Sequence, residues 1–297
     1  MKDALFLAFM SGVIGELKAG KKDRTAEIYT TTLHSFRRFL GGKDISSRKV
    51  TSTLMIHYER WLMESGVTRN TSSFYMRVLR AVYNRAAAQG LTRRDNPFRQ
   101  VYTGIDKTRK RAVDVSVIRR MKQLDLSGKP HLMFARDLFL FSFYTRGMSF
   151  VDMAWLRPSD IRDGCLSYVR RKTGQPIRIK WETCMQEIVD RYPPFPAGYL
   201  LPIIRYLDIS ERSQYRNVLF RVNSGLAEIS RMIHVDPPVT TYVARHSWAT
   251  IAYSQDIPIS VISEGLGHDS ERTTRIYLAS VSNTKVDKAN TKIIGLL

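Results

Sequence analysis

Five polar side chains in the second half of the chain could act together on a bound anion. They are Arg146, Lys172, Arg245, His268 and Tyr277, and Tyr277 follows His268 by nine residues. A guanidinium is always charged and can hold two oxygens in a fork, whereas lysine and histidine can move protons and a tyrosine hydroxyl can act as a nucleophile. Each residue alone also fits a structural role, such as a helix-end charge or an exposed turn lysine. Arg245 fits such a role poorly, because its neighbours in sequence are mostly apolar.

The runs around these residues form an ordered pattern. The run ARHSWAT contains Arg245, and the run LGHDSERTTRIY extends from Leu266 to Tyr277. In residue type and spacing they resemble the tyrosine recombinases, also called phage-type integrases, and the resemblance covers nearly the whole chain. The run RKTG with Lys172 supports it, and the run RGMSFVDMA, which starts at Arg146, resembles one bacterial branch of the family.

The resemblance implies a transesterification at a DNA phosphodiester. Tyr277 would attack the scissile phosphorus and form a 3′-phosphotyrosyl bond while the 5′-hydroxyl leaves. Arg146 and Arg245 would hold the non-bridging oxygens. His268 would assist proton movement at the tyrosine, and Lys172, on a hairpin, would protonate the leaving oxygen. Because the bond energy stays in the covalent link, the resemblance implies no ATP and no other cofactor.

Two positions depart from the common pattern of the family. Its acidic residue usually lies three positions after the first arginine, but here the nearest, Asp152, lies six after Arg146. We expect Asp152 to keep a supporting role in the site. The position three before Arg245, usually a histidine, is Tyr242. A phenol can donate one hydrogen bond to a phosphate oxygen but holds no proton-linked positive charge near neutral pH, so we include Tyr242 in the candidate catalytic set for hydrogen bonding alone.

Charge is the unusual quantity in the composition. The 297 residues include 47 Lys and Arg against 27 Asp and Glu, a formal net charge of +20, which favours polyanionic partners. The first 111 residues carry 22 of the basic and 9 of the acidic residues, so +13 of the surplus lies there and +7 in the rest. This asymmetry is typical of a DNA-gripping module followed by a less basic one.

The basic first third of the chain reads as helices. Apolar residues recur at helical spacing over 29–40, 54–62 and 74–86, with glycines after each run. Aromatic residues on these faces are predicted to be core rather than base-stacking platforms, and arginines on the other faces are predicted to contact phosphates. The candidate DNA-binding residues are Arg69, Arg77, Arg80 and Arg85 in the third helix and Lys107, Arg109, Lys110 and Arg111 in the run that follows.

The remainder of the chain predicts helices and one β-hairpin. Helical patterns cover 115–124, 132–144 and 240–253, and alternating strands at 166–169 and 176–181 flank a turn at Gly174. With the resemblance, the fold class is mainly α with a small β-hairpin or sheet. We expect a SAM-like helical core-type DNA-binding domain over 1–105, a basic linker over 106–111, and an α+β catalytic domain with a C-terminal tail over 112–297. The resemblance implies that the two domains close as a clamp around duplex DNA.

Several other classes are not supported. No stretch approaches the about 18–20 apolar residues of a membrane span, and the first nine residues are too weak for a secretory signal. No phosphate-binding glycine run or His/Cys cluster is present, so we predict no metal and no nucleotide. The two cysteines, Cys165 and Cys184, indicate a reducing compartment. We expect a cytoplasmic, nucleoid-associated protein of a bacterium.

Three functions compete within this interpretation. The first is a site-specific recombinase that integrates, excises or inverts DNA segments, as in a mobile element. The second is a type IB topoisomerase, and the third is a non-catalytic DNA-binding relative. The expected partners of the first are duplex DNA with short inverted recognition sites, other copies of the chain in a homotetramer, and accessory DNA-bending proteins. The apolar residues 293–297 would either pack on their own domain or, as the resemblance suggests, dock on a neighbouring protomer.

Overall fold

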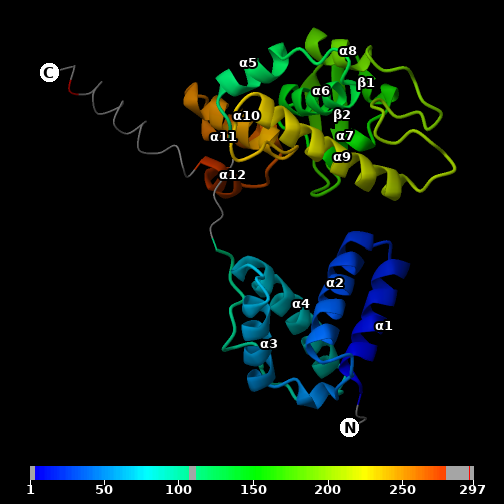
Figure 1. The fold of residues 1–297 in the computed structure, drawn as a ribbon, viewed down its shortest axis with the longest axis vertical. Coiled ribbons are helices and arrows are strands. Elements are labelled where there is room, and N and C mark those ends of the chain that lie inside the picture. The colour runs from blue at the N-terminus through cyan, green and yellow to red at the C-terminus, as the bar shows by residue number, and fades with distance from the viewer. Residues whose placement is uncertain (1–3, 107–111, 279–293, 295–297) are drawn as a thin grey trace. The chain divides into compact units, whose positions relative to one another are not determined.

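The computed structural model describes residues 4–106, 112–278 and 294, with residues 276–278 placed as helical backbone. The chain divides into two compact units, residues 1–108 and 109–297 (Figure 1). Most of the predicted linker, residues 107–111, lies outside the described residues, and so does the predicted tail apart from residue 294.

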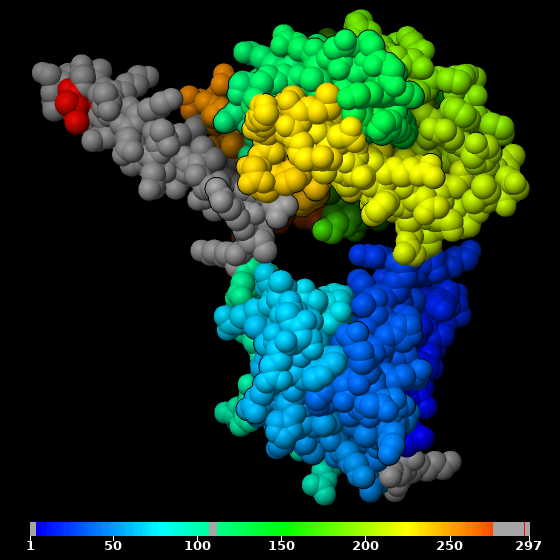
Figure 2. All heavy atoms as spheres, viewed as in Figure 1, coloured from blue at the N-terminus to red at the C-terminus, as the bar shows by residue number. Residues whose placement is uncertain are grey.

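The first unit is a small helical domain around an aromatic core. Phe36 is fully buried, and the ring of Tyr58 lies 4.9 Å from it. The Tyr58 hydroxyl donates to Ser35 Oγ at 2.8 Å, which satisfies the one polar atom of this side chain. The prediction that these aromatic residues are core is confirmed. The helices are α1 (Phe6–Ala19), α2 (Asp23–Phe39), α3 (Ser52–Glu64) and α4 (Arg69–Ala88), with a short 3-10 turn at Ser47–Lys49. On the face shown in Figure 2, α2 and α3 form the surface of this unit.

The second unit is built around one buried helix. Helix α6 is apolar on nearly every side, since Leu138 and Phe139 are both fully buried. It packs against α5, α8, α9 and α10, and it delivers Arg146 at its carboxyl end. The helices of this unit are α5 (Val115–Gln123), α6 (Pro130–Tyr144), α7 (Phe150–Ala154), α8 (Thr183–Val189), α9 (Glu211–Met232), α10 (Val243–Ser254), α11 (Ile259–Leu266) and α12 (Glu271–Leu278).

A three-stranded antiparallel sheet lies beside α6, in the order β1 (Ile161–Arg162), β2 (Cys165–Val169), β3 (Pro176–Lys180). Leu166 pairs with Ile179, and both side chains are buried on the face toward the core. The predicted hairpin and the mainly helical fold class are therefore confirmed. The helix predicted from residue 240 begins at Val243, because the residues before it form a turn closed by the Val243 N–H to Thr240 O hydrogen bond.

A buried carboxylate ties α6 to the end of α8. Asp137 is fully buried, and it accepts hydrogen bonds from Arg191 Nη1 at 2.8 Å and from the Tyr192 hydroxyl at 2.9 Å. Arg136 Nε lies 3.4 Å from the same carboxylate. Removing one partner from such a pair leaves buried charge without compensation. The network therefore holds α6 in the place from which Arg146 reaches the candidate site.

We predict that Asp137→Asn lowers the free energy of unfolding by about 3 kcal/mol, because it leaves Arg191 and Arg136 without a buried counter-charge. Urea unfolding of the full chain measures it. The control is Glu182→Gln, whose ion pair with Lys180 at 3.4 Å is exposed and contributes about 0.5 kcal/mol or less. Equal losses for the two variants would contradict the prediction.

Candidate active site

Arg245 joins three segments that are far apart in sequence. It lies in the first turn of α10 and is only 4% exposed. Its Nη1 donates to Gly147 O at 3.0 Å, and its Nη2 donates to Leu266 O at 2.5 Å. The same Nη2 lies 3.0 Å from His268 Nε2. One guanidinium thus holds the turn after α6, the end of α11 and the predicted histidine in fixed positions.

The turn after α6 places Arg146 next to this group. Arg146 and Gly147 have φ angles of +59° and +74°, in the left-handed region. A Cβ on Gly147 would lie 2.5 Å from the Arg245 Cα, so only glycine lets the turn approach α10 this closely. A non-glycine residue in this region is strained, and such strain clusters at functional sites. The Arg146 Cδ lies close to Gly265 of α11, 3.7 Å from the place of a Cβ there, and the Arg146 guanidinium makes no hydrogen bond or ion pair within the described residues.

His268 is held on both ring nitrogens. It follows Gly267, which ends α11 in the left-handed conformation. Its Nδ1 lies 2.9 Å from Thr274 Oγ1 on α12, and its Nε2 faces Arg245. Because a guanidinium only donates, Nε2 accepts and the proton lies on Nδ1. Burial, followed by the charges of Arg245, Arg170 and Lys172, lowers the pKa of His268 to about 4. The imidazole is therefore neutral at physiological pH.

Lys172 lies in the exposed turn between β2 and β3, beside two arginines that are anchored on opposite sides. Arg170 is buried, and its Nη1 donates to Gly267 O. The Arg171 backbone N–H donates to Asp152 Oδ1 at 2.9 Å, and its guanidinium lies 4.3 Å from the Trp155 ring centroid. The turn with Lys172 is thus attached to the rest of the unit just before the lysine.

Asp152 has a defined set of partners. It is buried in α7, where Oδ1 accepts from the Arg171 N–H and Oδ2 accepts from Ser149 Oγ at 2.6 Å. Ser149 also caps α7, since its Oγ accepts from the Asp152 N–H at 3.3 Å. Asp152 contacts the hairpin rather than Arg146. This arrangement agrees with the predicted supporting role of Asp152, in which the carboxylate fixes the position of the hairpin that carries Lys172.

Tyr242 lies one turn before Arg245, at the start of α10. Its side chain is 53% exposed, and its ring packs edge-on against His246 with centroids 4.6 Å apart. Tyr277 lies on α12, three residues after Thr274, and α12 packs against α10 and α11. The side chain of Tyr277 lies outside the described residues. The structure thus brings together Arg146, Arg245, His268 and the hairpin, and it places the helix of Tyr277 beside them.

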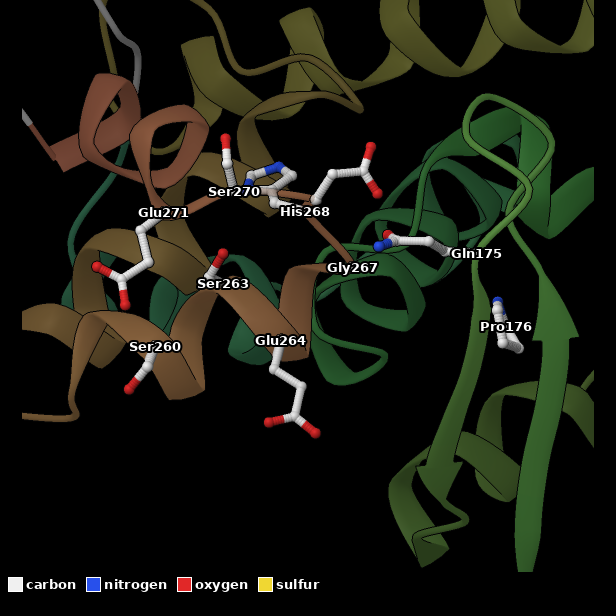
Figure 3. A pocket seen from close by; sticks show the side chains of 10 residues that line it. Gln175, Pro176, Ser260, Ser263, Glu264, Gly267, His268, Ser270 and Glu271 are labelled. Carbon is white, nitrogen blue, oxygen red and sulfur yellow. The ribbon is translucent and has the colours of Figure 1, made fainter.

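A cavity of about 410 Å³ lies beside His268. One wall comes from the hairpin, where Gln175 extends toward Gly267, and the other comes from α11 with Ser260 and Glu264 (Figure 3). A larger groove of about 910 Å³ between α6 and α9 includes none of the candidate site residues. Within residues 4–106 and 112–278, no group of three or more His, Cys, Asp or Glu could hold a metal ion.

Two residues of the site were missed in the sequence. Tyr168 is largely buried, and burial followed by the Asp152 carboxylate raises the pKa of its phenol, while Arg245, Arg170 and Arg146 act in the opposite direction. The Tyr168 side chain is therefore close to Arg245, Arg170 and Arg146. Its signal was the strand alternation, which points Tyr168 to the same face as Leu166. Arg170 directly precedes the RKTG run, and nothing in the sequence indicated its burial, because basic residues at a turn are usually exposed.

The predicted DNA-binding arginines of the first unit all lie on α4. Arg69 lies 3.9 Å from the Tyr102 ring centroid and pairs with Asp106 at 3.6 Å, and Arg80 Nη1 donates to Thr103 Oγ1 at 3.3 Å. These contacts pin the last residues of the unit to α4. Arg85 pairs with Glu16 on α1, and exposed pairs of this kind contribute little stability. The fourth, Arg77, is partly buried on the same helix. Lys107, Arg109, Lys110 and Arg111 lie outside the described residues.

Comparison with known proteins shows which proteins the chain resembles in sequence and in fold. The profile of the Phage integrase SAM-like domain matches residues 5–102. The tyrosine recombinase XerD of Halalkalibacterium halodurans is 23% identical over 240 residues, which are 78% of this chain and 78% of that protein. A tyrosine recombinase of Pseudothermotoga lettingae is 21% identical over 281 residues, which are 90% of this chain and 91% of that protein. The crystal structure of a lambda integrase tetramer bound to a Holliday junction matches with a TM-score of 0.70 at 17% identity, covering 93% of this chain and 78% of that one.

The structural and sequence matches give different information about the chain. The structural match at 17% identity establishes the integrase fold, a helical SAM-like unit followed by a second unit that holds the arginine–histidine cluster. The sequence matches extend over both units. In sequence the chain is similar to named tyrosine recombinases over most of its length, and its first unit matches the Phage integrase SAM-like domain. No helix within its described residues is long and apolar enough to cross a membrane.

We predict that His268 titrates with a pKa near 4 in the folded protein, because burial and the neighbouring cations oppose its protonation. The unfolded chain binds this proton at about pH 6.5. The folded protein therefore loses stability as the pH falls from about 6.5 toward 4. NMR titration of histidine-labelled protein measures the shift, with His268→Gln to assign the signal and free imidazole as the reference. A His268 signal that titrates together with the free imidazole would contradict the prediction.

Proposed function

We propose that the protein is a tyrosine-type site-specific recombinase that cuts and rejoins DNA through a 3′-phosphotyrosyl intermediate. One observation carries this proposal: Arg245 and Thr274 hold opposite nitrogens of the His268 imidazole, and Thr274 lies on the same helix as Tyr277. The candidate nucleophile is thus on an element attached directly to the phosphate-binding cluster. Sequence similarity supports this assignment, because the matched relatives are named tyrosine recombinases.

The proposed reaction conserves bonds at phosphorus. The Tyr277 oxygen attacks the phosphorus, a P–O bond to tyrosine forms, and the bond to the 5′-oxygen breaks. In the second half, a 5′-hydroxyl of a partner strand attacks the phosphotyrosine and releases Tyr277. Arg146 and Arg245 hold the non-bridging oxygens, where negative charge grows in the transition state. The guanidinium of Arg146 suits this role, because no described residue occupies its donors.

Proton movement falls to His268 and Lys172. A neutral imidazole can accept a proton. His268 Nδ1 carries the ring proton and donates it to Thr274, so Nε2 is the atom that could receive the tyrosine proton, in exchange for the hydrogen bond that it accepts from Arg245 Nη2. The Lys172 ammonium gives a proton to the leaving 5′-oxygen. Asp152 positions the hairpin that carries Lys172. Tyr242 can add one hydrogen bond to a phosphate oxygen but no proton-linked charge.

The basic first unit is proposed to bind the duplex by its phosphates, through α4 and the residues that follow it. The surplus of +13 in the first 111 residues should make binding strongly dependent on salt. The match to a lambda integrase tetramer on a Holliday junction supports a homotetramer on synapsed DNA with short inverted sites. The reaction would integrate, excise or invert DNA segments with accessory DNA-bending proteins, in the bacterial cytoplasm at the nucleoid.

We predict that Tyr277→Phe abolishes the covalent protein–DNA adduct and leaves DNA binding unchanged, because only the attacking oxygen is lost. The wild-type protein is first used to trap its site from a library of genomic fragments, and the site is rebuilt as a nicked suicide duplex. Adduct is scored on denaturing gels and binding by mobility shift. Tyr206→Phe, an exposed tyrosine at the α6–α9 groove, is the control and should form adduct normally. An adduct with Tyr277→Phe would sink the assignment.

We predict that Arg245→Lys lowers the cleavage rate by at least about 100-fold, because an ammonium cannot replace the fork that holds both Gly147 O and the phosphate. Single-turnover cleavage of the suicide duplex at saturating protein measures the loss. Arg221→Lys, at an exposed position of α9, should cleave like the wild type. Near-parental cleavage by Arg245→Lys would count against a phosphate role.

Supercoiled plasmids distinguish a recombinase from a topoisomerase. A recombinase rearranges a plasmid that carries two copies of the trapped site and leaves a plasmid without the site unchanged. Relaxation of both plasmids at equal rates would favour the type IB topoisomerase instead. Adduct formation itself excludes a non-catalytic DNA-binding protein.

A further inference from the structure

Arg170 is a buried cation that the reaction scheme does not use. It is 6% exposed and forms no ion pair within the described residues. Its Nη1 donates to Gly267 O, and its Nε is buried without a hydrogen-bond partner in the described part of the chain. A buried charge without a counter-ion opposes folding by several kcal/mol in general. Packing alone therefore does not explain an arginine at this position. The hydrogen bond from its Nη1 to Gly267 O indicates what it does.

That contact reaches the residue directly before His268. Gly267 is left-handed, with φ +61°, and the hairpin packs against its Cα. A Cβ there would lie 2.7 Å from Ile177 Cδ1 and 3.0 Å from Arg170 Cδ. Gln175 also extends to this point from the far end of the turn (Figure 3). The hairpin and the corner that carries His268 are therefore fitted to each other through a position with no side chain.

The backbone of Arg170 fixes the turn that carries Lys172. The Arg170 N–H donates to Gln175 O and the Gly174 N–H donates to Arg170 O, both at 2.8 Å. These two backbone bonds close the loop around Lys172. Arg170 thus fixes both the base of this loop and its contact with the His268 corner, whereas Asp152 holds the loop from the opposite side.

We propose that Arg170 is a positioning residue for strand cleavage: it clasps the β2–β3 hairpin to the Gly267–His268 corner and so fixes where Lys172 delivers its proton. This inference rests on the proposed role of Lys172 as the general acid. Arg170 itself need not touch DNA. Its charge also contributes to the low pKa of His268, behind burial and Arg245, which agrees with its place beside the imidazole.

A substrate that needs no general acid isolates this role. In a suicide duplex with sulfur in place of the bridging 5′-oxygen at the cleaved phosphate, the P–S bond breaks and a thiolate leaves without taking up a proton. We expect Arg170→Gln to cleave the oxygen duplex about 100-fold more slowly, as for a misplaced catalytic group. On the sulfur duplex it should cleave at nearly the wild-type rate. Lys172→Ala should show the same pattern, and Arg178→Gln, at an exposed position of β3, should match the wild type on both duplexes.

Two further variants separate positioning from folding. Gly267→Ala leaves the Arg170 charge in place but pushes the hairpin from the corner, so it should also be rescued by sulfur. Arg170→Lys keeps a charged donor with a shorter reach and should recover part of the lost rate on the oxygen duplex. Thermal unfolding of each variant is measured in parallel, and the sulfur duplex serves as an internal check that the rest of the site is intact.

The outcomes separate this inference from the proposed function. Rescue of both Lys172→Ala and Arg170→Gln by sulfur supports the clasp. Rescue of Lys172→Ala alone, with Arg170→Gln equally slow on both duplexes, overturns the positioning role and leaves the acid role intact. No rescue of Lys172→Ala overturns the acid role itself, and the positioning role with it. Unchanged cleavage of the oxygen duplex by Arg170→Gln overturns the positioning role alone.

Discussion

The buried guanidinium of Arg245 is the contact on which the site depends. A cation this deep in a protein is tolerated only when its donors find acceptors, and here the acceptors include two backbone carbonyls and an imidazole from two separate segments. The carbonyl of Gly147 fixes the turn after α6, and that of Leu266 fixes the end of α11. The remaining parts of the site are placed relative to this group. Positive charge is thereby collected in one place, and a phosphate bound there, as proposed, would require little reorganisation of the site.

The β2–β3 hairpin is also held in place by contacts with distant segments, although it is more exposed than Arg245. A β-turn on the surface is usually among the least stable parts of a domain, because few apolar contacts hold it. Here Asp152 holds it from one side and Gly267 contacts it from the other. A proton donor on a loose loop would spend little time in reach of one oxygen. Anchoring both sides of its base converts a surface turn into a part with a defined position while leaving Lys172 itself accessible.

The sequence predicted the candidate site residues but not the contacts that hold them. Arg245 and His268 stand in runs that resemble a known family, so the resemblance singled them out as candidates, and the alternation of polar and apolar residues predicted β2 and β3. The contacts of Asp152 and Arg170 join residues distant in sequence, and only the fold reveals them. Helix α1 was not predicted, although Phe6, Met10 and Val13 have helical spacing, because its apolar residues are close to the start of the chain and are interrupted by two glycines. Asp152 lies six positions after Arg146, where Ser149 caps α7 and donates to the carboxylate, and where the carboxylate reaches the hairpin.

Gly147 has no side chain and contributes only its backbone carbonyl to the site, yet a single added carbon there would meet the backbone of α10. The same holds at Gly267, where the added carbon would meet Ile177. The set of positions at which mutation inactivates the protein is therefore wider than the set of reactive groups. A random screen for inactive variants would find close-packed positions such as these glycines as well as the functional groups. These glycines would rank among the least replaceable residues in the chain.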